Sequence, residues 1–122
     1  FSKKVYIVEG INDELFLKKL LSKFNKQYEQ YSIFQCYGKP HFLPFVMIFK
    51  NLGIDVVLLF DEDKTTNRIN LSINAKLEEN KHYKFCEYLE QELGYVGKNN
   101  TPEFLTFLDD YNNYEKYLSI IE

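Results

Sequence analysis

The sequence predicts an α/β fold, with a mostly parallel sheet of about four strands and helices on both of its faces. Two observations lead to this prediction. Short runs rich in β-branched and aromatic residues alternate with longer segments whose apolar residues recur at helical spacing, the order of elements typical of parallel sheets. The run Ile54–Phe60 is also apolar on both sides, as expected of a central parallel strand that helices cover on both faces.

The first expected strand is Val5–Glu9, and Gly10 permits a tight turn after it. Asn12 is a good helix N-cap, and Asp13 favours a first helical turn because it interacts with the helix dipole. Apolar residues at helical spacing then predict a helix over about residues 13–25.

A second strand is expected at Ser32–Tyr37, where Gly38 ends it. Pro40 suits the first turn of a second helix, and Gly53 ends that helix before the third strand, Ile54–Phe60.

The rest of the chain has weaker patterns. We expect a helix with Ile69, Ile73 and Leu77 on its apolar side, a short fourth strand at residues 82–85, a helix Glu87–Leu93 closed by Gly94, a helix opened by Thr101-Pro102-Glu103, and a helical tail at residues 112–121.

The length of 122 residues suits one domain, residues 1–122. Because the first residue is Phe1 rather than Met, we expect a fragment of a longer chain. No apolar stretch is long enough to span a bilayer, so we expect no membrane partner. Cys36 and Cys86 lie in apolar surroundings, which favours buried free thiols and a cytoplasmic protein.

The net charge of −3 argues against a self-sufficient nucleic-acid-binding domain, which is usually basic. Arg68 is the only arginine, so bidentate phosphate clamps are nearly absent. If the chain binds nucleic acid, metal ions and another domain must supply much of the positive field.

Three carboxylates follow one another at Asp61-Glu62-Asp63, directly after the third strand. Two such groups about 4 Å apart repel by about 4 kcal/mol at an effective dielectric of about 20, so solvent, a lysine or a metal ion must offset their charge. Side chains alternate along an extended backbone, so we expect Asp61 and Asp63 to share a face and Glu62 to point elsewhere.

Two further acids reach the same edge of the predicted sheet, because sites in parallel sheets form at the carboxyl ends of the strands. Glu9 ends the first strand and Asp13 begins the helix after it. Taken singly, each acid has an ordinary role, as a turn cap, a helix-start acid or part of a solvated loop. Delivered together from separate segments, they favour a site for Mg²⁺ or Mn²⁺, which prefer oxygen ligands. One or two such ions can activate water and stabilise the leaving oxygen of a phosphodiester.

The segments VYIVEGINDELFLKKLL and GIDVVLLFDED resemble the Toprim domain of topoisomerases, bacterial-type primases and certain nucleases. That domain has a Glu-Gly after its first strand and an Asp-x-Asp after its third. The more specific likeness is to the C-terminal Toprim nuclease domain of the OLD (overcoming lysogenization defect) family, which includes the nuclease subunit of the Gabija anti-phage system. Its first motif, Glu-Gly-x-x-Asp/Glu, fits EGIND, and its Gly-Lys before the second helix is similar to YGKPHF. The resemblance covers nearly all of residues 4–110.

The resemblance implies a set of site residues. Four acids match motif positions directly: Glu9, Asp13, Asp61 and Asp63. The family also places a Glu after the Asp-x-Asp and a Lys shortly before a helix, and EYLEQELGYVGKNNTPEF can supply both. The Glu is Glu87 or Glu90, of which we prefer Glu90, and the Lys is Lys98. Some relatives have a small hydroxyl residue where this chain has Leu59, so that contribution to the site is missing.

The same resemblance implies a Toprim-like, Rossmann-like fold and a DNA endonuclease that uses one or two Mg²⁺ or Mn²⁺ ions, with a role in anti-phage defence. Asp61 and Asp63 would hold one ion together with Glu9 or Asp13, and Glu90 would help to hold a second. Glu9 would also take part in proton transfer, and Lys98 would neutralise charge on the phosphate.

OLD proteins carry an ABC-type ATPase ahead of the Toprim domain. This sequence has no G-x-x-x-x-G-K-[ST] loop and therefore no ATP site of its own. The expected partners are DNA, an upstream ATPase domain in the parent protein, and further copies assembled through the parent chain.

Three rival functions remain. The first is another Toprim chemistry, that of a primase or a topoisomerase. A topoisomerase needs a nucleophilic tyrosine, and none of the ten tyrosines stands out as a candidate. A non-catalytic Toprim scaffold is the second, although a scaffold has no need of mutually repelling acids. The third, a phosphoacceptor receiver domain, would need an acidic pair at the end of the first strand, where this chain has only Glu9.

Overall fold

A parallel sheet of four strands forms the centre of the molecule in the computed structural model, which describes residues 4–26, 29–62, 68–97 and 100–122. The strands are β1 (Lys4–Val8), β2 (Tyr31–Gln35), β3 (Asp55–Asp61) and β4 (His82–Phe85), and their order across the sheet is β2-β1-β3-β4. All three pairings are parallel. The predicted fold class is therefore confirmed, including the short fourth strand.

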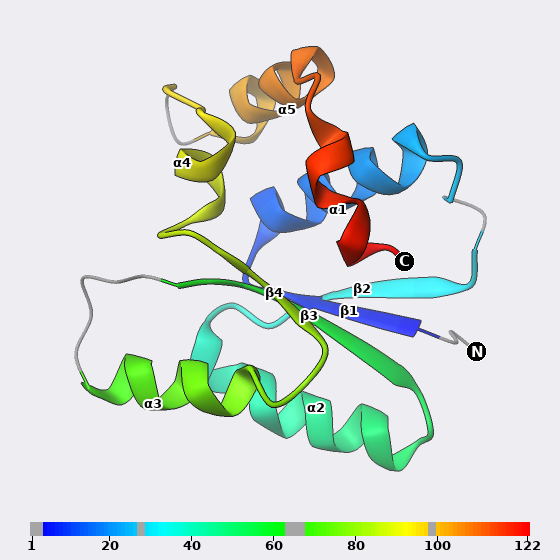
Figure 1. Cartoon of the computed structure of the whole chain (residues 1–122), viewed down its shortest axis with the longest axis vertical. Helices are drawn as coiled ribbons and strands as arrows, with labels where there is room; N and C mark the ends of the chain where they lie inside the picture. The colour runs from blue at the N-terminus through cyan, green and yellow to red at the C-terminus, as the bar shows by residue number, and fades with distance from the viewer. Residues whose placement is uncertain (1–3, 27–28, 63–67, 98–99) are drawn as a thin grey trace.

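Helices cover both faces of this sheet (Figure 1). On one face lie α1 (Ile11–Lys23), α4 (Leu89–Leu93), α5 (Thr101–Asp110) and the 3₁₀ segment η2 (Tyr114–Ile120). On the other face lie α2 (Phe42–Asn51) and α3 (Arg68–Leu77), with the short 3₁₀ turn η1 (Lys39–His41) leading into α2. None of the described helices is both long enough and apolar enough to cross a bilayer.

The central strand β3 supplies side chains to two separate hydrophobic cores. Val57 and Leu59 pack with α1, α5 and η2, whereas Leu58 and Phe60 pack with α2 and α3. This alternation follows from the strand period of two, and it explains why β3 is apolar at successive positions.

The strand order creates a crossover point between β1 and β3. From β1 the chain passes through α1 to β2 on one side of the sheet, and from β2 it passes through α2 to β3 on the other side of β1. The helices after β1 and after β2 therefore lie on opposite faces, and the carboxyl ends of β1 and β3 lie side by side, with Val8 opposite Leu59. Ligand sites in open α/β sheets form at this kind of position.

Several local predictions were wrong in detail. The N-cap of α1 is Gly10 rather than Asn12, and the helix begins two residues earlier than expected. Helix α4 begins at Leu89 rather than Glu87, because Glu87 has a φ of 60° that no helix accommodates. Helix α5, in contrast, begins at Thr101 as expected, and its N-cap is Asn100, whose side chain accepts a hydrogen bond from the backbone N–H of Glu103.

The tail is helical as expected, but η2 is a 3₁₀ segment. The two cysteines are both free, and they differ in exposure. Cys36 is buried as expected, whereas Cys86 is exposed, contrary to its apolar sequence context. The reason is its position: Cys86 follows the last residue of β4, where the chain leaves the core.

Candidate active site at the carboxyl edge of the sheet

Two acids meet where β1 and β3 end. Glu9 follows the last residue of β1, and Asp61 is the last residue of β3. The backbone N–H of Asp61 donates to Oε2 of Glu9 at 3.4 Å, and the charge of Glu9 acts on the carboxyl group of Asp61. The adjacent parallel strands thus bring together two carboxyl groups that are 52 residues apart in the sequence.

Asp13 lies on the first turn of α1, beside this pair. Its Oδ2 accepts a hydrogen bond of 3.1 Å from the backbone N–H of Gly10, so the carboxylate also closes the amino end of the helix. The residue is only 7% exposed. An ordinary helix-start acid is solvated, and the burial of Asp13 therefore distinguishes it from that simpler role.

Glu90 approaches the same group of acids from α4. Oδ1 of Asp61 accepts a hydrogen bond of 3.0 Å from the backbone N–H of Leu89, which ties the end of β3 to the start of α4. Oε1 of Glu90 accepts a hydrogen bond of 2.9 Å from the side chain of Asn12 on α1. Asn12 is not the N-cap that we expected. Its side chain instead holds Glu90, which we preferred to Glu87 as the later acidic ligand.

Burial and mutual repulsion raise the pKa values of Glu9, Asp13 and Asp61. Loss of solvent is the larger cause for Asp13, and the charge of Asp61 adds to it, so that the pKa of Asp13 rises to about 8. Loss of solvent likewise raises the pKa of Asp61, with the Glu9 charge second, and the charge of Glu90 contributes to both. The pKa of Glu9 is also raised, chiefly by burial. These are the shifts expected when carboxylates share a site from which water is largely excluded.

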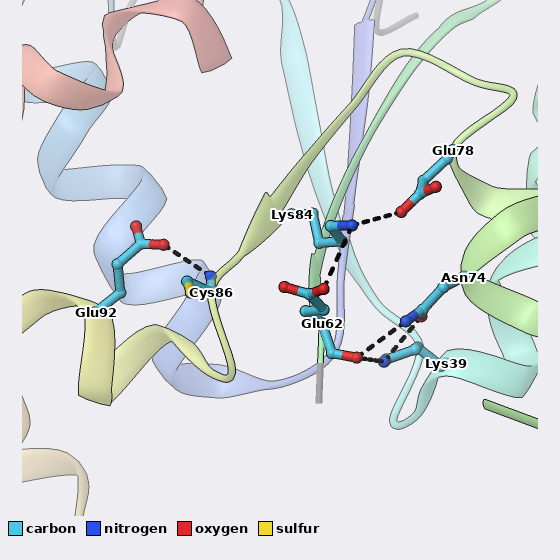
Figure 2. A network of polar contacts seen from close by, with 7 residues as sticks. All are labelled: Lys39, Glu62, Asn74, Glu78, Lys84, Cys86 and Glu92. Carbon is cyan, nitrogen blue, oxygen red and sulfur yellow. Dashed lines mark hydrogen bonds and ion pairs between the residues drawn. The ribbon is translucent and has the colours of Figure 1, made fainter. Parts of the chain in front are cut away.

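Glu62 faces away from the acids, as strand alternation predicts. Its Oε1 lies 3.8 Å from Nζ of Lys84 on β4 (Figure 2), and Lys84 also pairs with Glu78 at 2.7 Å. The middle member of the acidic triplet thus belongs to a separate ion-pair network, which confirms this part of the prediction.

Lys39 is a feature of the site to which sequence reasoning assigned no role. It is 6% exposed and lies in η1, immediately after Gly38. Its positive charge acts on Glu9 and lowers the pKa of that carboxyl, against the larger effect of burial. We expected solvent, a lysine or a metal ion to offset the acidic charge, and Lys39 is such a lysine.

Asp63 and Lys98 lie outside the described residues, so the predicted site can be followed only at Glu9, Asp13, Asp61 and Glu90. Within the described part of the chain, no three acidic, histidine or cysteine side chains are arranged closely enough to hold a metal ion. The donor set nevertheless fits a hard cation, because it consists of carboxylate oxygens, and those of Glu9, Asp13 and Asp61 have raised pKa values and a charge that a divalent ion would balance. The assignment of metal ligands remains a prediction.

Comparison with known proteins agrees with this architecture. A family model described as "Overcoming lysogenization defect protein-like, TOPRIM domain" matches residues 1–63, just over half of the chain. This range contains Glu9, Asp13, Asp61 and Asp63, whereas Glu90 and Lys98 lie beyond it.

A solved structure, the C-terminal region of the Burkholderia pseudomallei OLD protein, superposes with a TM-score of 0.64 at 17% sequence identity. The match covers 99% of this chain and 81% of that one, and at this identity it establishes the fold. No match is found among curated proteins.

Proposed function

The chain belongs to the OLD-like Toprim domain family, and on that premise we propose that it is a metal-dependent endonuclease domain that hydrolyses phosphodiester bonds of DNA. The observation that carries the proposal is the contact of Glu9 with Asp61 at the crossover between β1 and β3, with the buried Asp13 near enough for its charge to act on Glu9. Their negative charge and the lack of solvent favour a divalent cation, and we assign its further ligands to Asp63 and Glu90.

The described residues divide into ligands and supports. Asp61, together with Glu9 or Asp13, would hold one ion, and Glu90 with the remaining acid would hold a second. Mg²⁺ or Mn²⁺ supplies an activated water and stabilises the leaving oxygen in such sites. Asn12 orients Glu90, and the N–H of Leu89 orients Asp61, so both carboxylates are held before any substrate arrives.

Glu9 is the residue suited to proton transfer. Burial raises its pKa, and its contact with Asp61 gives it a neighbour with which a proton can be shared. By family resemblance Asp63 completes the ligand pair with Asp61, and Lys98 stabilises charge that develops on the phosphate. Both assignments concern residues outside the described part of the chain.

The partners follow from charge and from the family. With a net charge of −3, the chain needs additional positive potential to bind DNA. We propose that an ATPase domain in the parent protein and a second copy assembled through it supply part of this potential. We also propose that the activity operates in the cytoplasm, in defence against phage, as the family resemblance implies.

Nicking of supercoiled plasmid DNA in the presence of Mn²⁺ or Mg²⁺ tests the proposal. Asp61→Ala should abolish nicking and should weaken Mn²⁺ binding in calorimetry, while the circular dichroism spectrum remains that of the wild type. Glu62→Ala is the matched control, because this adjacent acid faces Lys84 and should retain activity. Full nicking by Asp61→Ala would reject the site. A covalent DNA–protein adduct would favour a topoisomerase instead, and a wild-type chain that ignores both ions would favour a scaffold.

A further inference from the structure

Two buried polar side chains converge on one backbone carbonyl at the end of β3. Nζ of Lys39 lies 3.3 Å from the carbonyl oxygen of Glu62, and Nδ2 of Asn74 donates to the same oxygen at 2.9 Å (Figure 2). Lys39 also donates to Oδ1 of Asn74 at 3.0 Å, which closes a triangle of hydrogen bonds. Since a carbonyl oxygen has two lone pairs, both acceptor positions of Glu62 are used.

Placing these groups in the interior costs free energy. Lys39 is 6% exposed and Asn74 is 5% exposed, and a buried ammonium group is stable only when it is hydrogen-bonded or paired. The ring of Phe60, with its centroid 5.8 Å from Nζ, gives Lys39 one further favourable contact. An apolar side chain at either position would avoid the desolvation cost, so the hydrogen bonds to Glu62 call for an explanation beyond stability.

The carbonyl that Lys39 and Asn74 hold belongs to the peptide unit linking Glu62 to Asp63. The N–H of Glu62 belongs to the preceding peptide unit, and it donates to the carbonyl of Phe85 on β4 at 2.9 Å. The backbone of Glu62 is thus fixed at its N–H by the sheet and at its carbonyl by side chains from η1 and α3. Glu62 lies directly between the two aspartates of the Asp-x-Asp motif.

We propose that Lys39 and Asn74 are positioning residues: by fixing the carbonyl of Glu62, they hold the carboxyl end of β3 and with it Asp61, the proposed metal ligand. This inference rests on the proposed function, since it concerns the geometry of the proposed metal ligands. Residues that orient metal ligands typically alter metal affinity by about 10- to 100-fold when they are replaced. Gly38, with a φ of 131°, makes the turn that brings Lys39 into this position.

The variants Lys39→Met and Asn74→Leu test the proposal, because each removes hydrogen-bonding groups and preserves much of the side-chain volume. Lys84→Met is the matched control: this lysine also contacts Glu62, but it reaches the carboxylate instead of the carbonyl. Far-ultraviolet circular dichroism and thermal melting verify that each variant folds. Should Lys39→Met not fold, Asn74→Leu decides the question.

The first readout needs no metal. Hydrogen exchange of the segment at residues 58–62 should be at least tenfold faster in Lys39→Met and Asn74→Leu than in the wild type, and unchanged in Lys84→Met. The second readout is Mn²⁺ affinity by calorimetry, where Asn74→Leu, which removes no charge, should bind at least tenfold more weakly. Lys39→Met should lose less affinity, because removal of its positive charge near Glu9 favours the cation. Saturating Mn²⁺ should restore most of the nicking rate, which separates positioning from participation in the chemistry.

Two results would overturn the inference while leaving the proposed function intact. One is unchanged exchange at residues 58–62 in both variants, and the other is wild-type Mn²⁺ affinity in a folded Asn74→Leu protein. Lack of Mn²⁺ binding by the wild type would instead refute the proposed function, and the inference with it. An equal loss of affinity in Lys84→Met would also overturn the inference, because a general weakening of the Glu62 region would then explain the effect.

Discussion

Asp13→Asn should stabilise the protein in the absence of metal ions. The substitution replaces a buried carboxylate by an amide of nearly the same shape, and the amide oxygen can still accept the hydrogen bond from the N–H of Gly10. Since one pKa unit corresponds to 1.36 kcal/mol, the rise from 3.8 to about 8 sets a ceiling of about 6 kcal/mol on the cost of the charged form. We expect roughly 2 kcal/mol, because buried sites respond with an effective dielectric near 20.

The gain should depend on pH, with a definite sign. The pKa of Asp13 is higher in the folded chain than in the unfolded chain, so the folded state binds the proton more tightly. Protonation of Asp13 therefore stabilises the folded chain. This stabilisation is complete below pH 3.8 and is lost as the pH rises through about 8. The wild type and Asp13→Asn should differ little near pH 4, and the difference should grow up to pH 8.

Thermal unfolding with EDTA measures this difference. Roughly 2 kcal/mol corresponds to a rise in melting temperature of about 8 °C for a domain of this size. Glu14→Gln is the control on the same helix. The pKa of Glu14 is lowered by its hydrogen bonds with Gln35 and Lys18, so this variant should lose stability above pH 4.5. The two neighbouring acids should thus respond in opposite directions.

Added Mn²⁺ should reverse the order of the wild type and Asp13→Asn. At an ion concentration of about 100 times the dissociation constant, binding stabilises the folded wild type by about 2.7 kcal/mol, whereas the variant lacks a proposed ligand and should gain less. Two results would refute this reasoning. One is an Asp13→Asn protein that is less stable than the wild type at pH 8 without metal, and the other is a stability difference that stays constant between pH 4 and pH 8.

Three further predictions concern the fold around the site. Phe85 is fully buried against Phe16 and Tyr83, so Phe85→Ala should lower the free energy of unfolding in urea by about 3–5 kcal/mol. Gly38→Ala should cost about 1–2 kcal/mol in thermal unfolding, because a φ of 131° strains any residue with a Cβ atom; an unchanged melting temperature would contradict this. Iodoacetamide should label the exposed Cys86 alone in the folded protein, detectable by mass spectrometry. Cys36 should react only on unfolding, since burial raises the pKa of its thiol to about 12.

Much of the fold could be predicted because its signals are local. The apolar runs of β1 and β3 and the helical spacing after them depend only on neighbouring residues, and glycine marks the turns. The edge at which Glu9 and Asp61 meet followed from the same reasoning, since parallel strands bring their carboxyl ends together. Glu62 was placed correctly by strand alternation alone.

The role of Lys39 could not be predicted because its partners are distant. Among them are a side chain 35 residues further along the chain and a backbone carbonyl, which leaves no mark in the sequence. A weak signal does exist in α3, where Asn74 interrupts the apolar side formed by Ile73 and Leu77. A buried polar residue among core positions requires a partner, and a search for that partner is the way to find such contacts from sequence.

The cost of the site argues for catalysis and against a scaffold. Repelling carboxylates at Asp13 and Asp61 and a buried ammonium at Lys39 each lower the stability of the metal-free fold, and isosteric neutral or apolar residues would remove that cost. A domain used only to connect other parts gains nothing from keeping these groups together at one edge of its sheet. A domain that binds a divalent ion would recover the cost of the acids on binding, because the ion balances their charge, and Lys39 would act through the backbone next to the proposed ligands. Stability that is low without metal and regained with it would therefore distinguish the nuclease from the scaffold.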